Sequence, residues 1–277
     1  MDNILNQDLI AIRLLYQKEL GFDLCDKSNA EHAFYKNYQI LLQLETKCEE
    51  YSYILLHNLF GPIEYLQELR KLSEKKYRVW KNRLIKNTQS VGLYGDLFEL
   101  HITWSLVKKN INFISSESPD FKILHKKSYI YIECTCSQFD FNKSPSKESI
   151  LLKIISTVQG KMNSNYANNS TCLFVDITNL CYHAKLLDSF ITQKELSQSV
   201  FSASQKIKEF DSSKTFGAIM FFWINIIKDS KGNIIYATNS FNIIQNKNAD
   251  PNLIEFLLKN NIDIPKKKQM VNPKFNH

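Results

Sequence analysis

Two acidic residues, Asp120 and Glu133, lie on either side of a short polar segment, 125–128, that is typical of a tight β-turn. If this turn has two central residues, the flanking strands form a hairpin in which Asp120 stands opposite Glu133. Two carboxylates in direct cross-strand register repel each other. A divalent cation such as Mg²⁺ or Mn²⁺, which prefers oxygen ligands, would remove that repulsion. The pair therefore predicts a metal site.

The strand that carries Glu133 has two faces of different character, because side chains alternate between the faces of a β-strand. One face is apolar and is predicted to lie in the core. The other is polar and is predicted to line a cleft. The apolar face holds Ile130, Ile132, Cys134 and Cys136, and the cleft face holds Tyr131, Glu133, Thr135 and Ser137.

A third acid, Glu99, is predicted to reach the same cleft from a helix that begins near Gly92. Apolar residues at helical spacing give this helix a side that can pack on a sheet. Gly95 lies one turn before Glu99 and is expected to let the helix backbone approach the strands closely. The apolar residues of the helix are Leu93, Leu97, Leu100, Trp104 and Val107.

The helix acid Glu99, the Pro119-Asp120 pair and the strand acid Glu133 occur in the order helix, hairpin, helix, strand. This combination resembles the PD-(D/E)xK nuclease superfamily, which has the restriction-endonuclease-like fold, over roughly residues 90 to 180. The resemblance implies that Asp120 and Glu133 hold one or two Mg²⁺ or Mn²⁺ ions, with Glu99 contributing directly or through water. It also implies hydrolysis of phosphodiester bonds in nucleic acid, with DNA as the expected substrate.

The sequence departs from the family pattern at one position. The pattern places a lysine two residues after the strand acid, where this chain has Thr135. A hydroxyl can position water, but it adds no positive charge. Three lysines are candidate replacements: Lys122, two residues after Asp120, and Lys153 and Lys161 in the segment after the hairpin, which the family folds as a helix beside the site. Lys161 is favoured because its neighbours resemble the basic or amide-rich helix of the family.

The element pattern predicts an α/β fold with a mixed sheet flanked by helices. Residues 1–89 are predicted to form a helical region, 90–245 the restriction-endonuclease-like core, and 246–277 a C-terminal helix and basic tail. After the hairpin, the apolar periodicity predicts further helices and strands. The helices are expected at 149–166, 183–210 and 252–260, a central buried strand at 171–178, and a hairpin of strands at 216–227 and 234–244.

A strongly basic helix is predicted for residues 63–87, after a break at Gly61-Pro62. Its cations clearly outnumber its acids, so it could follow a phosphate backbone. The alternative is a solvated face with some Glu–Lys pairs. The candidate nucleic-acid ligands are Lys75, Lys76, Arg78, Lys81 and Arg83.

The composition sets wide limits on function. The chain has 277 residues, of which 44% are hydrophobic, a share that is ordinary for a globular protein. Its formal net charge of +7 fits a polyanionic partner but does not require one. No apolar run reaches the ~18 residues of a membrane-spanning helix, so no membrane association is expected. The six cysteines lack metal or redox spacing and are expected to be reduced core residues of a cytoplasmic protein.

Two other hypotheses remain open at this stage. One is a catalytically inactive module that keeps the nuclease fold and binds nucleic acid or a protein, which Thr135 favours. The other is an α/β protein without a nucleic-acid role, in which the basic helix is ordinary surface. A Cys–His hydrolase is disfavoured, because Cys134 and Cys136 are expected on the apolar face of their strand. A homodimer is left open.

Overall fold

A computed structural model describes most of the chain, which divides into two compact units, Met1–Asn110 and Ile111–His277. Each unit is considered by itself. Helix α5 clusters with the N-terminal helices, whereas the sequence grouped it with the sheet. The described residues are 2–43, 49–86, 90–138, 147–181, 193–208, 215–228, 230, 234–260 and 268–269.

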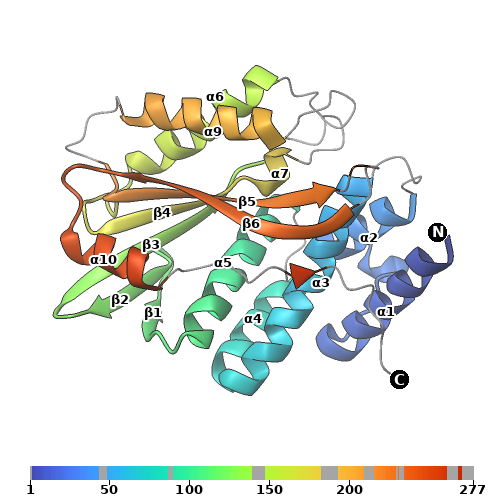
Figure 1. The fold of residues 1–277 in the computed structure, drawn as a ribbon. Helices are drawn as coiled ribbons and strands as arrows, with labels where there is room; N and C mark the ends of the chain where they lie inside the picture. The colour runs from blue at the N-terminus through green and yellow to red at the C-terminus, as the bar shows by residue number, and fades with distance from the viewer. Residues whose placement is uncertain are drawn as a thin grey trace. The chain divides into compact units, whose positions relative to one another are not determined.

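The described part of the N-terminal unit is helical, as predicted (Figure 1). Its core is formed by apolar side chains at helical spacing, among them Leu9, Ile12 and Tyr16 of the first helix, which are at most 5% exposed. The elements are α1 (Asp2–Leu20), the 3₁₀ helix η1 (Lys27–Asn29), α2 (Ala33–Gln43), α3 (Glu49–Leu72), α4 (Glu74–Lys86) and α5 (Ser90–Lys108).

The predicted helix break at Gly61-Pro62 is wrong. Helix α3 continues through Pro62 and ends at Leu72, and Ser73 separates it from α4. Proline removes one helical hydrogen bond, but Leu59 and Ile63 on either side are almost fully buried. The Leu59 carbonyl also accepts a buried hydrogen bond of 2.9 Å from the hydroxyl of Tyr16. Tertiary packing therefore outweighs the local cost of the proline.

The C-terminal unit is built on a mixed sheet whose strands lie side by side in chain order. Strands β3, β4 and β5 are parallel, and the other neighbouring pairs are antiparallel. The mixed α/β class and the central parallel position of β4 are thus confirmed. The elements are β1 (Phe113–Ser115), β2 (Phe121–His125), β3 (Ser128–Cys136), α6 (Lys147–Met162), β4 (Thr171–Asp176), α7 (Thr178–Cys181), α9 (Gln193–Lys208), β5 (Ala218–Lys228), β6 (Ile234–Gln245), α10 (Pro251–Asn260) and β7 (Lys268–Gln269).

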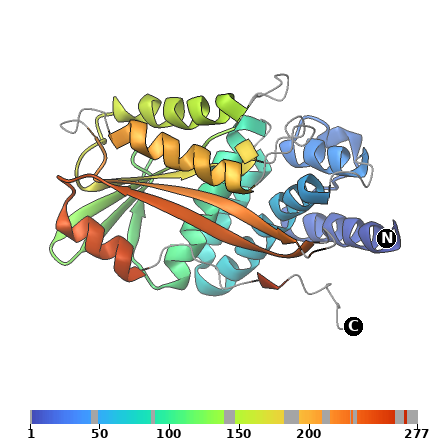
Figure 2. The same cartoon turned by 45° about the horizontal axis from the view of Figure 1, so that its top comes forward.

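Two helices, α6 and α9, lie side by side over one face of this sheet, and α10 lies on the opposite side near β2 and β3 (Figures 1 and 2). Helix α6 connects the parallel strands β3 and β4, as a crossover between parallel strands requires. The predicted helix over 149–166 ends earlier, at Met162. The Asn- and Ser-rich segment that follows favours turns over helix, because short polar side chains compete for backbone hydrogen bonds.

The predicted two-residue hairpin turn is confirmed. Strands β2 and β3 pair from Phe121↔Ile132 to His125↔Ser128, which leaves Lys126 and Lys127 as the central residues. Lys126 adopts a positive φ of 48°, the conformation that tight hairpin turns demand of a central residue. The turn fixes the register of the whole hairpin.

Gly217, which precedes β5, allows a close approach between backbone segments. A Cβ atom at this position would lie 2.0 Å from the carbonyl oxygen of Asn169 and 2.8 Å from a methyl carbon of Leu253 in α10. The Gly217 amide donates to the carbonyls of Asn168 at 3.0 Å and Thr171 at 2.9 Å. No side chain larger than hydrogen fits here without moving the start of β4, β5 or α10.

We therefore expect Gly217→Ala to lower the free energy of unfolding by about 2–3 kcal/mol, the usual cost of overpacking a tight site. Urea unfolding followed by circular dichroism measures this change.

The matched control is Gly160→Ala in α6, where a Cβ atom meets no described atom within 4 Å. Alanine should raise the stability there by about 0.5–1 kcal/mol, because it is the better helix former. Equal stability of the two variants would contradict the close approach at Gly217.

Candidate functional site

Asp120 and Glu133 are brought together by the register of the hairpin. Phe121, the first residue of β2, pairs with Ile132, so Asp120 and Glu133 are the next residues beyond the end of the β2–β3 ladder. The backbone amide of Cys134 donates to Asp120 Oδ2 at 2.6 Å. This bond fixes the Asp120 carboxylate beside β3. The hairpin and this hydrogen bond therefore hold Asp120 beside the segment of β3 that carries Glu133, and a metal shared by the two acids stays a prediction.

Glu133 is almost completely buried, with 4% of its surface exposed. Its Oε1 accepts hydrogen bonds from Lys161 Nζ at 2.7 Å and from the Tyr166 hydroxyl at 3.0 Å. Its Oε2 is buried and has no hydrogen-bond partner among the described residues. A buried carboxylate oxygen without a partner is costly, so the two oxygens of Glu133 are in very different situations.

Lys161 supplies the positive charge that balances Glu133. Burial alone would lower the pKa of Lys161, but the hydrogen bond and the negative charge of Glu133 outweigh burial and raise that pKa. The lysine is therefore firmly charged at neutral pH. Of the candidate replacements for the family's lysine, Lys161 is the one that contacts a hairpin acid.

Helix α6 positions Lys161 by packing on the face of β3 that carries Glu133. The hydroxyls of Ser137 in the β3 continuation and Thr157 in α6 share a hydrogen bond of 2.7 Å. Thr157 and Lys161 are one helical turn apart, so they lie on the same side of α6. Two polar contacts thus fix α6 against the Glu133 face.

Tyr166 is a site residue whose contact the sequence did not predict. It follows α6 in a loop, and its hydroxyl shares Glu133 Oε1 with Lys161. Its ring also lies 6.4 Å from the ring of Phe216, measured between centroids. A tyrosine beyond the end of a helix carries no periodic signal, so only the tertiary structure reveals its role.

The two faces of β3 follow the predicted alternation only in part. Ile130 and Ile132 are fully buried, as expected, but Cys134 and Cys136 are half-buried. On the predicted cleft face, Glu133 and Ser137 are buried because α6 covers them, while Tyr131 and Thr135 are half-buried. The polar face of β3 is therefore only partly exposed.

The cysteines show no sign of nucleophilic chemistry. Burial, and then the charge of Asp176, raise the pKa of the Cys136 thiol well above its ordinary value, so it stays protonated at neutral pH. Cys25, Cys134, Cys136 and Cys172 are free thiols. Only Cys172 of these is fully buried, and Cys25 is exposed, so the expectation of core cysteines is wrong for Cys25.

Lys122 points along the hairpin to an aromatic ring. Its Nζ lies 4.0 Å from the ring centroid of Tyr129, a cation–π distance. Asp176, the last residue of β4, accepts a hydrogen bond of 2.9 Å from the Thr178 amide. This bond stabilises the turn between β4 and α7.

Glu99 lies in the N-terminal unit, where it forms a bidentate pair with Arg83. The two guanidinium nitrogens of Arg83 donate to Glu99 Oε1 at 2.9 Å and Oε2 at 2.6 Å, and Arg83 also pairs with Asp96. Both carboxylate oxygens of Glu99 thus contact one cation. A role of Glu99 as a metal ligand stays a prediction, and it would compete with Arg83.

The reason expected for Gly95, a close approach of its helix to the strands, stays a prediction, because α5 and the strands belong to different units. The apolar stripe predicted for α5 is partly correct. Leu93 and Leu100 are fully buried, but Leu97, Trp104 and Val107 are half-buried, and Phe98, Ile102 and Leu106 are buried instead.

The candidate nucleic-acid ligands of the basic segment lie in α4, and they are not equivalent. Arg78 pairs with Glu74 at 2.8 Å across one helical turn, and Arg83 pairs with Asp96 and Glu99. Lys81 Nζ lies 6.0 Å from the Tyr77 ring centroid. Burial, and then the charge of Lys75, lower the pKa of Lys76. Two of the five cations are therefore committed to acids within their own unit.

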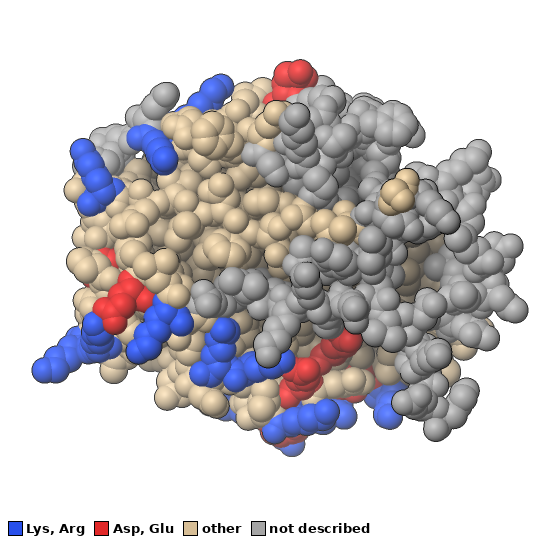
Figure 3. All heavy atoms as spheres, viewed as in Figure 1, with Lys and Arg blue, Asp and Glu red and all other residues tan. Residues whose placement is uncertain are grey.

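The charge on the visible surface is mixed. On the face drawn in Figure 3, the described Lys and Arg side chains are scattered, some of them beside Asp and Glu, and they form no continuous basic surface. Whether α4 binds nucleic acid stays a prediction.

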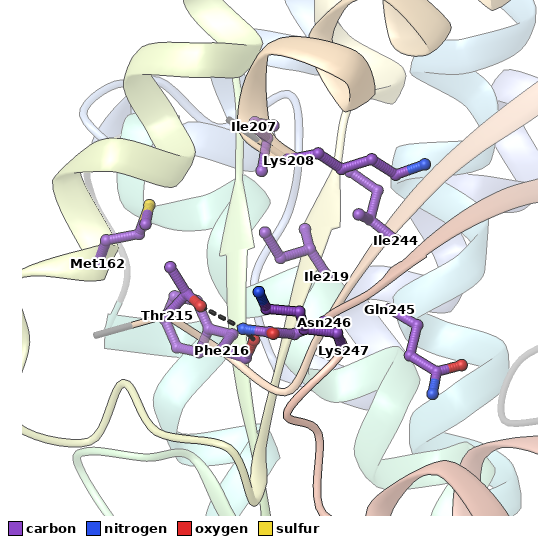
Figure 4. A pocket seen from close by; sticks show the side chains of 10 residues that line it. All are labelled: Met162, Ile207, Lys208, Thr215, Phe216, Ile219, Ile244, Gln245, Asn246 and Lys247. Atoms are coloured by element: carbon purple, nitrogen blue, oxygen red, sulfur yellow. Dashed lines mark hydrogen bonds between the residues drawn. The ribbon is translucent and has the colours of Figure 1, made fainter. Parts of the chain in front are cut away.

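A pocket of about 340 Å³ lies near the C-terminal ends of α6 and α9 (Figure 4). The register Glu133↔Leu173↔Ile219↔Ile244 places two of its lining residues, Ile219 and Ile244, in one cross-strand row with Glu133. Leu173 lies between them and the acid. Half of the lining residues are apolar and half are polar, Lys208 and Lys247 among them, and none of them is a predicted site residue.

The donor set at the hairpin fits a hard divalent cation. Among the described residues, no group of three or more His, Cys, Asp and Glu side chains is placed to hold a metal ion. Mg²⁺, however, commonly takes only one or two protein carboxylates and completes its shell with water and substrate phosphates. The carboxylates of Asp120 and Glu133, with the unpartnered Oε2 of Glu133, meet that requirement.

Comparison with known proteins adds no identification. No protein-family model matches the sequence, and a comparison with curated proteins finds no significant match. None of the helices in the described ranges has the length and apolar character needed to cross a membrane.

The Lys161–Glu133 pair predicts strong coupling between the two residues. Lys161→Met should lower the free energy of unfolding by about 2–3 kcal/mol, because it leaves a buried charge unpaired. Replacing both residues, by Lys161→Met with Glu133→Gln, should recover most of that loss. Urea unfolding of both single variants and the double variant gives the coupling energy.

The pH dependence of this coupling follows from the raised pKa of Lys161. The contribution of the pair is complete below the ordinary lysine pKa of 10.5 and is lost as the pH rises through the higher folded value. Additive effects of the two substitutions at neutral pH would show that the pair does not stabilise the fold.

Proposed function

We propose that the protein is a divalent-metal-dependent nuclease whose site consists of Asp120, Glu133 and Lys161. The observation that carries the proposal is that the two carboxylate oxygens of Glu133 have different surroundings. Lys161 and Tyr166 contact Oε1, while Oε2 is buried with no hydrogen-bond partner among the described residues. If the Lys161–Glu133 pair had only a structural role, it would not explain why Oε2 of Glu133 is buried without a hydrogen bond near a second acid, Asp120.

Each residue has a defined part in the proposed chemistry. Asp120 and Glu133 would hold Mg²⁺ or Mn²⁺, which lowers the pKa of a bound water and neutralises negative charge at phosphorus. The Cys134 amide holds the Asp120 carboxylate in place. Lys161 holds Glu133 and supplies the positive charge that Thr135 lacks. Thr135 lies two residues along β3 from Glu133 and offers a hydroxyl that can position water.

The order of elements supports the restriction-endonuclease-like fold as part of this proposal. Helix α5, the hairpin of β2 and β3, helix α6 and strand β4 follow one another along the chain. This is the helix, hairpin, helix, strand order of the nuclease superfamily that the sequence resembles. The parallel pairing of β3 with β4 across α6 agrees with that order.

Cleavage assays test the proposal. The purified protein should cleave plasmid DNA, single-stranded DNA or RNA in the presence of Mg²⁺ or Mn²⁺ and lose this activity with a chelator. Asp120→Asn, Glu133→Gln and Lys161→Met should each lower the rate by about 100-fold or more, because the first two weaken the proposed metal ligands and the third removes the cation beside Glu133.

Lys153→Met is the matched control for Lys161→Met, because Lys153 is a half-buried lysine of the same helix with no contact to Glu133 among its described contacts. It should retain full activity. Cleavage that survives in the Asp120→Asn protein would show that the activity does not come from this site.

A second candidate is a catalytically inactive module of the same fold that binds nucleic acid or a protein. The absence of a lysine at Thr135 and the closed ion pair at Glu133 Oε1 favour it. This candidate predicts nucleic-acid binding that salt weakens, no cleavage with any divalent ion, and equal binding by the wild type and Asp120→Asn.

A further inference from the structure

The Asp120–Glu133 face of the hairpin continues into a row of exposed apolar and aromatic side chains. Leu124 is 62% exposed, Ile114 58% and Tyr129 43%. The register pairs Leu124 with Tyr129, and it pairs Lys122 with both Ile114 and Tyr131. Because paired residues and alternate residues share a face, all of these side chains project on the same side as the two acids.

The opposite face of the same strands is closed. Phe121, Ile123, Ile130 and Ile132 are at most 1% exposed. The hairpin therefore already has a complete core face, and its other face would normally be polar. Clustered apolar side chains on such a face mark a binding surface. We call the surface formed by these side chains the hairpin platform: Ile114, Lys122, Leu124, Tyr129 and Tyr131.

The chemistry of the hairpin platform suits unpaired bases. Tyr129 and Tyr131 are alternate residues of β3, so their Cα atoms lie about 7 Å apart along the strand. The ammonium group of Lys122 lies 4.0 Å from the Tyr129 ring centroid. Flat rings interleaved with a cation are the means by which proteins hold single-stranded nucleic acid, through base stacking and phosphate contacts.

The position of the hairpin platform fits the same occupant. Glu133 is the next residue on this face of β3 after Tyr129 and Tyr131, and Asp120 precedes Lys122 on β2. A strand held by its bases on the two tyrosines therefore runs towards Asp120 and the edge of the buried Glu133 site. A duplex hides the faces of its bases within the stack, so it offers these rings far less to bind.

We propose that the hairpin platform binds a single-stranded segment of nucleic acid and leads it to Asp120 and Glu133. This inference rests on the proposed nuclease function, and it makes single-stranded or locally unpaired nucleic acid the substrate class. Lys126 and Lys127 at the turn add positive charge at the far end of the path, although Lys126 is paired with Glu255 of α10.

Fluorescence anisotropy with labelled single-stranded oligonucleotides tests the proposal. The full-length protein is used with a chelator and no divalent ion, so that binding is measured without cleavage. Tyr129→Ala and Leu124→Ser should each weaken binding about tenfold, within the range reported for loss of one base–aromatic contact. A duplex of the same sequence should bind more weakly to the wild type and respond little to either substitution.

Two control substitutions change exposed apolar residues elsewhere in the same unit. Leu152 of α6 is 62% exposed, like Leu124, and Phe201 of α9 is 61% exposed. Leu152→Ser and Phe201→Ala remove equally exposed apolar surface away from the hairpin, and they should leave binding unchanged. Circular dichroism and urea unfolding verify that all four variants are folded.

The outcomes separate this proposal from the proposed function. Weaker binding by the platform variants, with no cleavage by any protein, supports the hairpin platform and contradicts the nuclease. Wild-type affinity in Tyr129→Ala and Leu124→Ser overturns the hairpin platform even if the wild type cleaves. The proposal is also overturned if light scattering shows a wild-type dimer that these substitutions convert to monomer while the affinity for the oligonucleotide is unchanged. A second copy of the chain would then be the occupant of the hairpin platform.

Discussion

The buried charge of Glu133 is the constraint on which the candidate site depends. A carboxylate with 4% exposure is stable only if a cation and hydrogen-bond donors reach it. Lys161 and Tyr166 reach one oxygen. The other oxygen has no hydrogen-bond partner among the described residues, and Asp120 lies just beyond the end of the β2–β3 ladder, where it is bound by the Cys134 amide. The site therefore carries more negative than positive charge among Asp120, Glu133 and Lys161, which is the condition that attracts a divalent ion.

The sheet supplies the rigidity that such a site needs. Strand β3 belongs both to the hairpin with β2 and to the parallel ladder with β4, so its side chains are fixed from two sides. Helix α6 connects these two ladders and brings Lys161 to Glu133. Tight packing at Gly217 holds the start of β5 beside the loop before β4. The same alternation that buries Ile130 and Ile132 exposes Leu124 and Tyr129 next to the acids.

Local patterns in the sequence predicted the parts of the fold that depend on short-range physics. The two-residue turn and the period of two along β3 placed Asp120 opposite Glu133, and the apolar run around Leu173 predicted a central strand. Features that depend on tertiary packing were harder to predict from the sequence. Helix α3 continues through Pro62 because buried neighbours hold it, and α6 covers Glu133, which the sequence placed in an open cleft. The Tyr166–Glu133 and Arg83–Glu99 contacts join residues of different elements that are far apart in the sequence, so no local pattern could predict them.

The central claim is that Asp120 and Glu133 together bind a divalent cation. Crystals soaked in Mn²⁺ and measured at a wavelength where manganese scatters anomalously test it most directly. The account predicts an anomalous peak between the two carboxylates, with Glu133 Oε2 among its ligands and Lys161 still bound to Oε1, and no such peak in Asp120→Asn crystals. Anomalous density absent from this position at saturating Mn²⁺ would contradict the account.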